Sequence, residues 1–106
     1  MPPINVTVDW PDGDTQASVS QNPIEVGKGN GATVITWRKG VNVASFAITG
    51  LDSTVFNPSD SGGQGPSFTT TDANANTTLT TYNYTVSAVH TSGRTNSHDP
   101  EIENGS

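Results

Sequence analysis

The 106-residue chain contains ten acidic and four basic residues, which give a formal net charge of -6, and it contains no cysteine. The lack of cysteine excludes disulfide bonds, thiolate metal centres and a cysteine nucleophile, while the negative charge disfavours nucleic acid and anionic membrane surfaces as partners. Only 30% of the residues are hydrophobic, so we expect residues 1–106 to fold as a single domain around a thin core.

The amino-terminal stretch "MPPINVTVDW" has neither the basic region nor the apolar run of a signal peptide. No segment of the sequence approaches the length of a membrane span. The sequence therefore predicts a cytoplasmic protein of bacterial type that does not bind membranes.

The first third of the chain predicts short strands separated by turns. "QASVSQ" and "PIEV" predict one strand interrupted at Asn22-Pro23, because proline removes a donor from the ladder. "PDGD" predicts a turn before this strand, and "GKGNG" predicts a hairpin-like turn after it. In the first strand, "INVTVDW", alternation places four apolar residues on one face: Ile4, Val6, Val8 and Trp10.

The middle of the chain predicts the two central strands of the fold. "ATVITWRKG" alternates so that Ile35 and Trp37 share one face, with Val34 and Arg38 on the other. "VASFAITGL" alternates in the same way and predicts three residues on its inner face: Ala44, Phe46 and Ile48.

The last half of the chain begins with "NPSDSGGQGPS", residues 57–67, which holds three glycines and two prolines and predicts a long exposed loop. This loop suits either a recognition loop or a flexible linker. "SFTTTD" and the loop "ANANTT" follow, and then "LTTYNYTVSAVHT" shows the clearest alternation in the chain. "SGRT" then predicts a turn into a final strand. The inward positions of the alternating strand are Tyr82, Tyr84, Val86 and Ala88.

Seven to eight short strands without an amphipathic helix predict an all-β fold, in which sheets bury their apolar faces against each other as an antiparallel β-sandwich. Trp37 in the third strand and the Tyr-x-Tyr-x-Val strand starting at Tyr82 are similar to the immunoglobulin-like layout. "IEVGKGNGATVITWRKG" also resembles the strand–turn–strand of cupredoxins, and this leaves a cupredoxin-like sandwich as the alternative. Such a fold here lacks its copper site, since the chain has no cysteine and only His90 and His98 as histidines.

The closing sequence "HDPEIENG" resembles the ending of the DP-EP family, a group of small uncharacterised bacterial proteins with an Asp-Pro signature. This resemblance implies a domain type but no activity. The segment 99–106 is either a tail or a docked strand. In extended geometry its acids project to one side and Ile102 to the other, which favours docking. The candidate binding residues are His98, Asp99, Pro100, Glu101, Ile102, Glu103 and Asn104.

Several other chemistries have weaker support in the sequence. Asp9, Asp12 and Asp14 suggest a calcium loop, but their spacing does not match an EF-hand and an Asp-Gly turn explains them. "GKGNG" lacks the following helix that a phosphate site uses. The two histidines lie on either side of a turn without a nucleophile motif, so we expect neither catalysis nor a tightly bound transition metal.

The function predicted first is a non-enzymatic binding or self-assembly module without a cofactor, whose sheet edges and C-terminal segment engage a protein partner or a second copy. One alternative is a metal-binding or hydrolytic domain that uses His90, His98 and the C-terminal acids. The other is a carbohydrate-binding module that uses the tryptophans and tyrosines, although the inward phase of Trp37 predicts that this side chain lies in the core.

Overall fold

The computed structural model describes residues 3–105 and consists almost entirely of strands. The only helical segment in this range is a short 3-10 helix, Lys28–Asn30. It is neither long nor apolar enough to span a bilayer. The prediction of an all-β sandwich is confirmed. The strands are β1 Ile4–Asp9, β2 Ser18–Val19, β3 Ile24–Val26, β4 Thr33–Lys39, β5 Val43–Thr49, β6 Phe56–Asn57, β7 Ser67–Asp72, β8 Thr80–Asn83, β9 Thr85–His90, β10 Thr95–His98 and β11 Glu101–Asn104.

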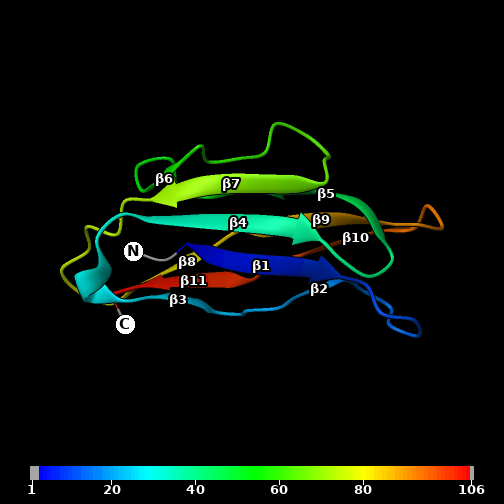
Figure 1. The fold of residues 1–106 in the computed structure, drawn as a ribbon, viewed down its shortest axis with the longest axis horizontal. Coiled ribbons are helices and arrows are strands. Elements are labelled where there is room, and N and C mark those ends of the chain that lie inside the picture. The colour runs from blue at the N-terminus through cyan, green and yellow to red at the C-terminus, as the bar shows by residue number, and fades with distance from the viewer. Residues whose placement is uncertain (1–2, 106) are drawn as a thin grey trace.

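The strands form three sheets that pack into an elongated body of 43 × 24 × 21 Å (Figure 1). A five-stranded sheet has the order β2-β1-β4-β7-β6, and two three-stranded sheets have the orders β10-β9-β5 and β3-β11-β8. Most ladders are antiparallel, as predicted. Two are parallel, between β1 and β4 and between β3 and β11, so the antiparallel prediction holds for part of the sandwich only.

The core follows from the period-two alternation of the strands. Ile35 and Trp37 on β4 are fully buried, whereas Val34, which directly precedes Ile35, is 41% exposed. Burying such apolar side chains stabilises the fold by about 1.5–3 kcal/mol each. The same alternation buries Val6, Val8, Trp10, Tyr84, Val86 and Ala88, as the sequence predicted.

The inner face of β5 differs from the prediction at its start. Ala44 is exposed, whereas Val43 and Phe46 are buried. The ladder between β5 and β9 shifts register between Val43 and Ser45, and such a bulge inserts one residue and reverses the facing of the residues beside it. The prediction that Ala44 faces inward is therefore wrong, while that for Phe46 and Ile48 is right.

The segment of residues 57–67 pairs with β5 instead of extending freely into solvent. The Phe46 and Gly65 backbones exchange two hydrogen bonds of 3.0 and 2.9 Å, and the Ser61 amide donates to the Ile48 carbonyl at 2.8 Å. Gln64 Nε2 also donates to the Ser87 carbonyl at 3.1 Å. Since β5 is the last strand of its sheet, this segment satisfies backbone groups along an edge. The segment is mostly exposed, as predicted, and its backbone is hydrogen-bonded to β5 along this edge.

The chain around Asn22-Pro23 passes from one sheet to another. β2 pairs with β1, whereas β3 pairs with β11 in a separate sheet. The single interrupted strand predicted here is therefore two strands. The turn at residues 27–31 joins β3 to β4, which do not pair with each other, so the predicted hairpin is wrong.

Candidate functional site

The C-terminal candidate segment forms the middle strand of a sheet. β11 pairs in parallel with β3 and antiparallel with β8, and the Glu101 amide donates a 3.0 Å hydrogen bond to Asn22 Oδ1. Ile102 is fully buried in the core, and Pro100 is also buried. The strand therefore docks within its own domain, and its apolar side chain is not available to a partner.

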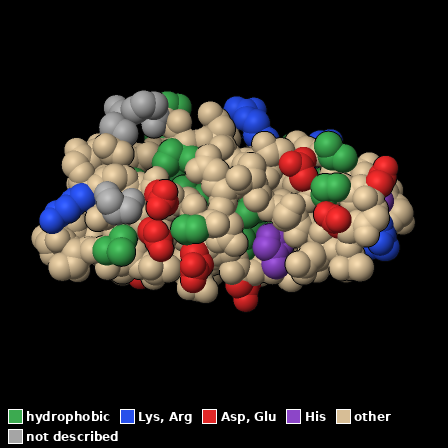
Figure 2. All heavy atoms as spheres, turned by 90° about the horizontal axis from the view of Figure 1, so that it is seen from below, with side chains coloured by type: hydrophobic (Ala, Val, Ile, Leu, Met, Phe, Trp, Pro, Cys, Tyr) green, Lys and Arg blue, Asp and Glu red, His purple; other side chains and the backbone are tan. Residues whose placement is uncertain are grey.

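The acidic residues of this segment lie on the opposite face of β11. Glu101 and Glu103 are half-exposed and alternate with the buried Ile102 and Asn104. In the parallel ladder Glu103 is directly opposite Glu25 of β3. Figure 2 shows acidic side chains gathered on the side of the molecule where β3 and β11 lie. We call Glu25, Glu101 and Glu103 the acidic face.

Asp99 precedes β11 and is exposed. Its Oδ1 atom accepts a 2.8 Å hydrogen bond from the Thr85 hydroxyl, which holds the start of the segment against β9. Because Asp99 alternates with the buried Pro100 and Ile102, it lies on the same outer side of the chain as Glu101. The predicted acids thus follow one another along a single outer surface.

The structure separates the two histidines. The His90 amide donates to the Arg94 carbonyl at 2.7 Å, and His98 pairs with Val86 at the other end of the β9–β10 hairpin. The two residues are four ladder positions apart, which corresponds to about 13 Å at ~3.3 Å per residue. No group of three or more His, Cys, Asp or Glu side chains within residues 3–105 is arranged to hold a metal ion.

His90 belongs to an aromatic and cationic cluster at one end of the sandwich. Its ring meets the Trp10 ring edge-on with centroids 5.1 Å apart, and the Arg94 guanidinium lies 5.2 Å from the same indole. The His90 Nδ1 atom accepts a 3.0 Å hydrogen bond from the Ser92 amide. These contacts assign His90 a structural role in the turn.

His98 lies in a contrasting environment. Both of its ring nitrogens are buried and have no hydrogen-bond partner within residues 3–105. Burial lowers the pKa of the imidazole, and the neighbouring Asp99 carboxylate opposes this with a smaller raising effect. The side chain is therefore held in its neutral form at neutral pH.

The aspartates of the "DWPDGD" stretch organise a turn. Asp9 Oδ1 accepts a 2.7 Å hydrogen bond from the Val41 amide, and Asp12 Oδ1 accepts one of 2.9 Å from Asn42 Nδ2. Their carboxylates join two neighbouring loops. Asp14 contributes through its backbone carbonyl, which accepts a 2.9 Å hydrogen bond from Trp10 Nε1.

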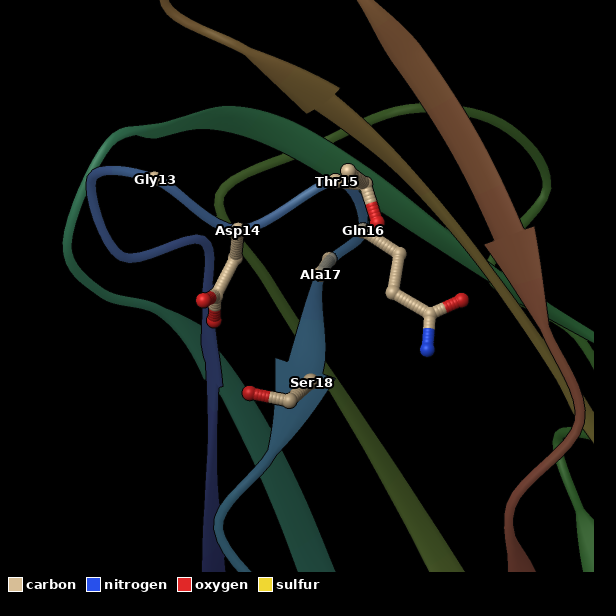
Figure 3. A pocket seen from close by; sticks show the side chains of 6 residues that line it. All are labelled: Gly13, Asp14, Thr15, Gln16, Ala17 and Ser18. Atoms are coloured by element: carbon tan, nitrogen blue, oxygen red, sulfur yellow. The ribbon is translucent and has the colours of Figure 1, made fainter.

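A polar hollow of about 350 Å³ lies beside this turn, a feature that sequence reasoning missed. Its lining side chains do not converge: Figure 3 shows Asp14 and Gln16 pointing in different directions. The Ala17 amide donates to Asn96 Oδ1 at 3.1 Å, which ties the hollow to β10. A mixture of short polar residues carries no sequence signal that would have revealed it. The lining residues are Gly13, Asp14, Thr15, Gln16, Ala17 and Ser18.

The aromatic residues considered for carbohydrate binding lie mainly in the core. Trp10, Trp37 and Tyr84 are each at most 1% exposed. Tyr82 is partly buried, packs edge-on against Phe56 at 5.4 Å, and accepts a 2.9 Å hydrogen bond from Asn76 through its hydroxyl. Together these four side chains form no exposed stacking surface.

Comparison of the chain with protein-family models and with curated protein sequences finds no match.

Proposed function

We propose that this domain is a non-enzymatic binding module that engages a basic, extended segment of another protein on its acidic face. The proposal rests on one observation, the register that sets Glu103 directly opposite Glu25 with Glu101 beside them. The chain's net charge of -6 extends the attraction for a basic partner beyond the contact itself.

Like charges that face each other across neighbouring strands destabilise a sheet by a few tenths to about 1 kcal/mol. Glu25, Glu101 and Glu103 make no side-chain hydrogen bond or ion pair with any described residue, so no described group offsets this repulsion. A cationic partner offsets this repulsion on binding, because each positive charge of the partner interacts with two carboxylates at once. The arrangement therefore favours association over the stability of the isolated domain.

The resemblance of "HDPEIENG" to the DP-EP family concerns the same strand. In this proposal the alternating residues of the motif have separate roles. Ile102 and Asn104 are buried and hold the strand in the core, whereas Glu101 and Glu103 face the partner. A second copy of the chain is also able to serve as the partner, since Arg38 and Lys39 are exposed at the end of β4.

A lysine-rich peptide of about twelve residues, labelled for fluorescence anisotropy, is the probe that tests this proposal. We expect the wild-type domain to bind it at low salt, with affinity falling as salt screens the charges. The triple variant Glu25→Gln, Glu101→Gln, Glu103→Gln should bind at least about tenfold more weakly, since three exposed pairs of about 0.5 kcal/mol each sum to roughly this factor.

The matched control neutralises three acids on the loops, Asp12→Asn, Asp14→Asn and Asp60→Asn, and so changes the net charge equally. It should keep most of the affinity if the acidic face is the binding surface. Equal losses in the two triple variants would show that only net charge attracts the peptide, which would refute the proposal. Native mass measurement of the same proteins shows whether a second copy is the partner, because the dimer should then disappear in the first triple variant alone.

A further inference from the structure

Three polar side chains are buried together at the end of the sandwich where β7 and β11 both finish. Asp72 and Asn104 are fully buried, and Asn74 is 5% exposed. Figure 1 shows that the last residues of β7 and β11 lie at the same end of the molecule as the turn that joins β3 to β4. The cluster thus connects the five-stranded sheet with the sheet that contains β11.

Hydrogen bonds link the Asp72 carboxylate to the Asn104 side chain and to the Asn74 backbone. Asp72 Oδ1 accepts from the Asn74 backbone amide at 2.9 Å and from Asn104 Nδ2 at 2.8 Å. Asn104 Nδ2 uses its second hydrogen on Asn76 Oδ1 at 3.1 Å. Asn74 Nδ2 donates to the carbonyls of Gly27 and Gly31 at 2.8 and 3.1 Å.

These acceptors fix the orientation of both amide groups. Each NH2 group faces two oxygens, so rotating either amide by 180° would set oxygen against oxygen. The side-chain oxygens of Asn74 and Asn104 must therefore point the other way. Both are buried, and neither accepts a hydrogen bond from any residue that the structure describes.

The second carboxylate oxygen of Asp72 is also buried and has no donor in the described part of the chain. The cluster thus contains three buried oxygen acceptors that receive no hydrogen from a described residue, on residues joined through the hydrogen bonds to Asp72 Oδ1. Leaving one buried acceptor unpaired costs about 1–3 kcal/mol, so an arrangement with three of them requires a further group.

The charge of the cluster is uncompensated as well. The described groups that act on the Asp72 carboxyl are the Asn104 and Asn74 donors, with no Lys, Arg or His among them. Burial raises the pKa of Asp72, which is the response of a carboxyl that lacks a nearby cation. Lys28 on the neighbouring turn is exposed to solvent.

From the three donor-less oxygens of Asp72, Asn74 and Asn104, we propose that this cluster binds a single monovalent hard cation, of which Na⁺ is the natural example. Carboxylate and amide oxygens are the ligands of hard cations. A monovalent ion matches the one carboxylate, whereas a divalent ion would leave a net positive charge in the core, which is costly. The bound ion ties the end of β7 to β11, and Asn74 connects the site to the turn of residues 27–31 through its hydrogen bonds to the Gly27 and Gly31 carbonyls.

The competing occupants satisfy fewer of these oxygens. A water molecule has two hydrogens for three acceptors and leaves the Asp72 charge uncompensated. A protonated Asp72 donates to one amide oxygen and leaves the other unpaired. A cation accepts several oxygen ligands at once and also neutralises the charge.

Urea unfolding of the full chain in different chloride salts at constant ionic strength tests this inference. We expect the midpoint to rise when Na⁺ replaces N-methyl-D-glucammonium, because an ion that binds only the folded state stabilises it by mass action. At Na⁺ concentrations well above the dissociation constant, each tenfold increase in concentration should lower the unfolding equilibrium constant tenfold. Asp72→Asn should abolish this dependence, whereas the control Asp14→Asn, which removes the charge of an exposed side chain outside the acidic face, should keep it.

A second measurement avoids any folding defect of Asp72→Asn. The ²³Na resonance should broaden in the presence of the wild-type protein, and the broadening should be lost on unfolding in urea. Equal midpoints in the two salts without ²³Na broadening would overturn the proposal and leave a water molecule or a protonated carboxyl at the site. Stabilisation by calcium chloride but not by sodium chloride would overturn the monovalent assignment.

Discussion

The indole nitrogen of Trp37 donates a 3.1 Å hydrogen bond to the hydroxyl of Tyr84 across the buried core. Trp37 belongs to the five-stranded sheet, whereas Tyr84 lies between β8 and β9, which belong to the two other sheets. The rings also meet edge-on with centroids 5.4 Å apart. This pair therefore connects all three sheets through one polar contact inside an apolar core.

Substitutions of this pair should differ in cost. Trp37→Ala removes a fully buried aromatic side chain and should lower the free energy of unfolding by about 3–5 kcal/mol. Tyr84→Phe keeps the ring but leaves the Trp37 N–H unpaired, and should cost about 1–3 kcal/mol. Urea midpoints measure both effects. A midpoint unchanged by Tyr84→Phe would mean that the hydrogen bond contributes no net stability.

The buried His98 should make stability depend on pH. Burial lowers the pKa of His98 in the folded state below the value of 6.5 that the unfolded chain shows. As the pH falls through 6.5, the unfolded state takes up a proton that the folded state does not, so stability decreases on acidification. Urea unfolding between about pH 7.5 and 5.5 should show this slope.

The variants His98→Gln and His90→Gln show which histidine causes the pH dependence of stability in that experiment. We expect the slope to disappear in His98→Gln and to persist in His90→Gln, since the pKa of His98 is the one lowered by burial. The opposite pattern would assign the pH dependence to the cluster with Trp10.

Ile102 should be the residue of the C-terminal segment on which the fold depends most. Ile102→Ala leaves a cavity in the core and should cost about 2–5 kcal/mol. Val41→Ala is the control, since Val41 is 58% exposed and its substitution should change stability by less than about 0.5 kcal/mol. A chain ending at His98 lacks β11 altogether, and we expect its circular dichroism spectrum to lose the folded signal. A cooperative transition at the wild-type temperature would contradict this.

The acidic face should reduce the stability of the isolated domain. Glu103→Gln relieves the repulsion with Glu25 and should raise the free energy of unfolding by a few tenths to about 1 kcal/mol at low salt. The gain should shrink as salt increases, because the Debye length falls to about 10 Å at 0.1 M. Thermal unfolding of the wild-type and variant proteins at two salt concentrations checks both expectations.

Much of the core could be predicted, because successive side chains of a strand point alternately to its two faces, and this alternation can be read from the local sequence. The burial of Trp37 and the exposure of Val34 follow directly from a local period of two. Ala44 was placed wrongly because a bulge changes the phase by one residue, and nothing in "VASFAITGL" distinguishes a bulged strand from a regular one.

The pairing of strands could not be predicted from local sequence. Residues 24–26 pair with residues 102–104, and the segment of residues 57–67 pairs with β5, although neither sequence contains a signal for its partner. The acidic face depends on the first of these pairings, since the sequence alone does not bring Glu25 to Glu103. The buried cluster had one overlooked signal: Asp72, Asn74 and Asn76 alternate just where "SFTTTD" meets "ANANTT".

The central place of β11 in its sheet has a consequence for the order in which the protein folds. β3 and β8 share β11 as their partner and do not pair with each other, so their inner edges have no ladder until residues 101–104 have been synthesised. Contacts between residues so far apart in sequence form slowly. During translation the nascent chain therefore exposes two unpaired strand edges, and chaperone binding or misassembly should concentrate at β3 and β8 in this interval.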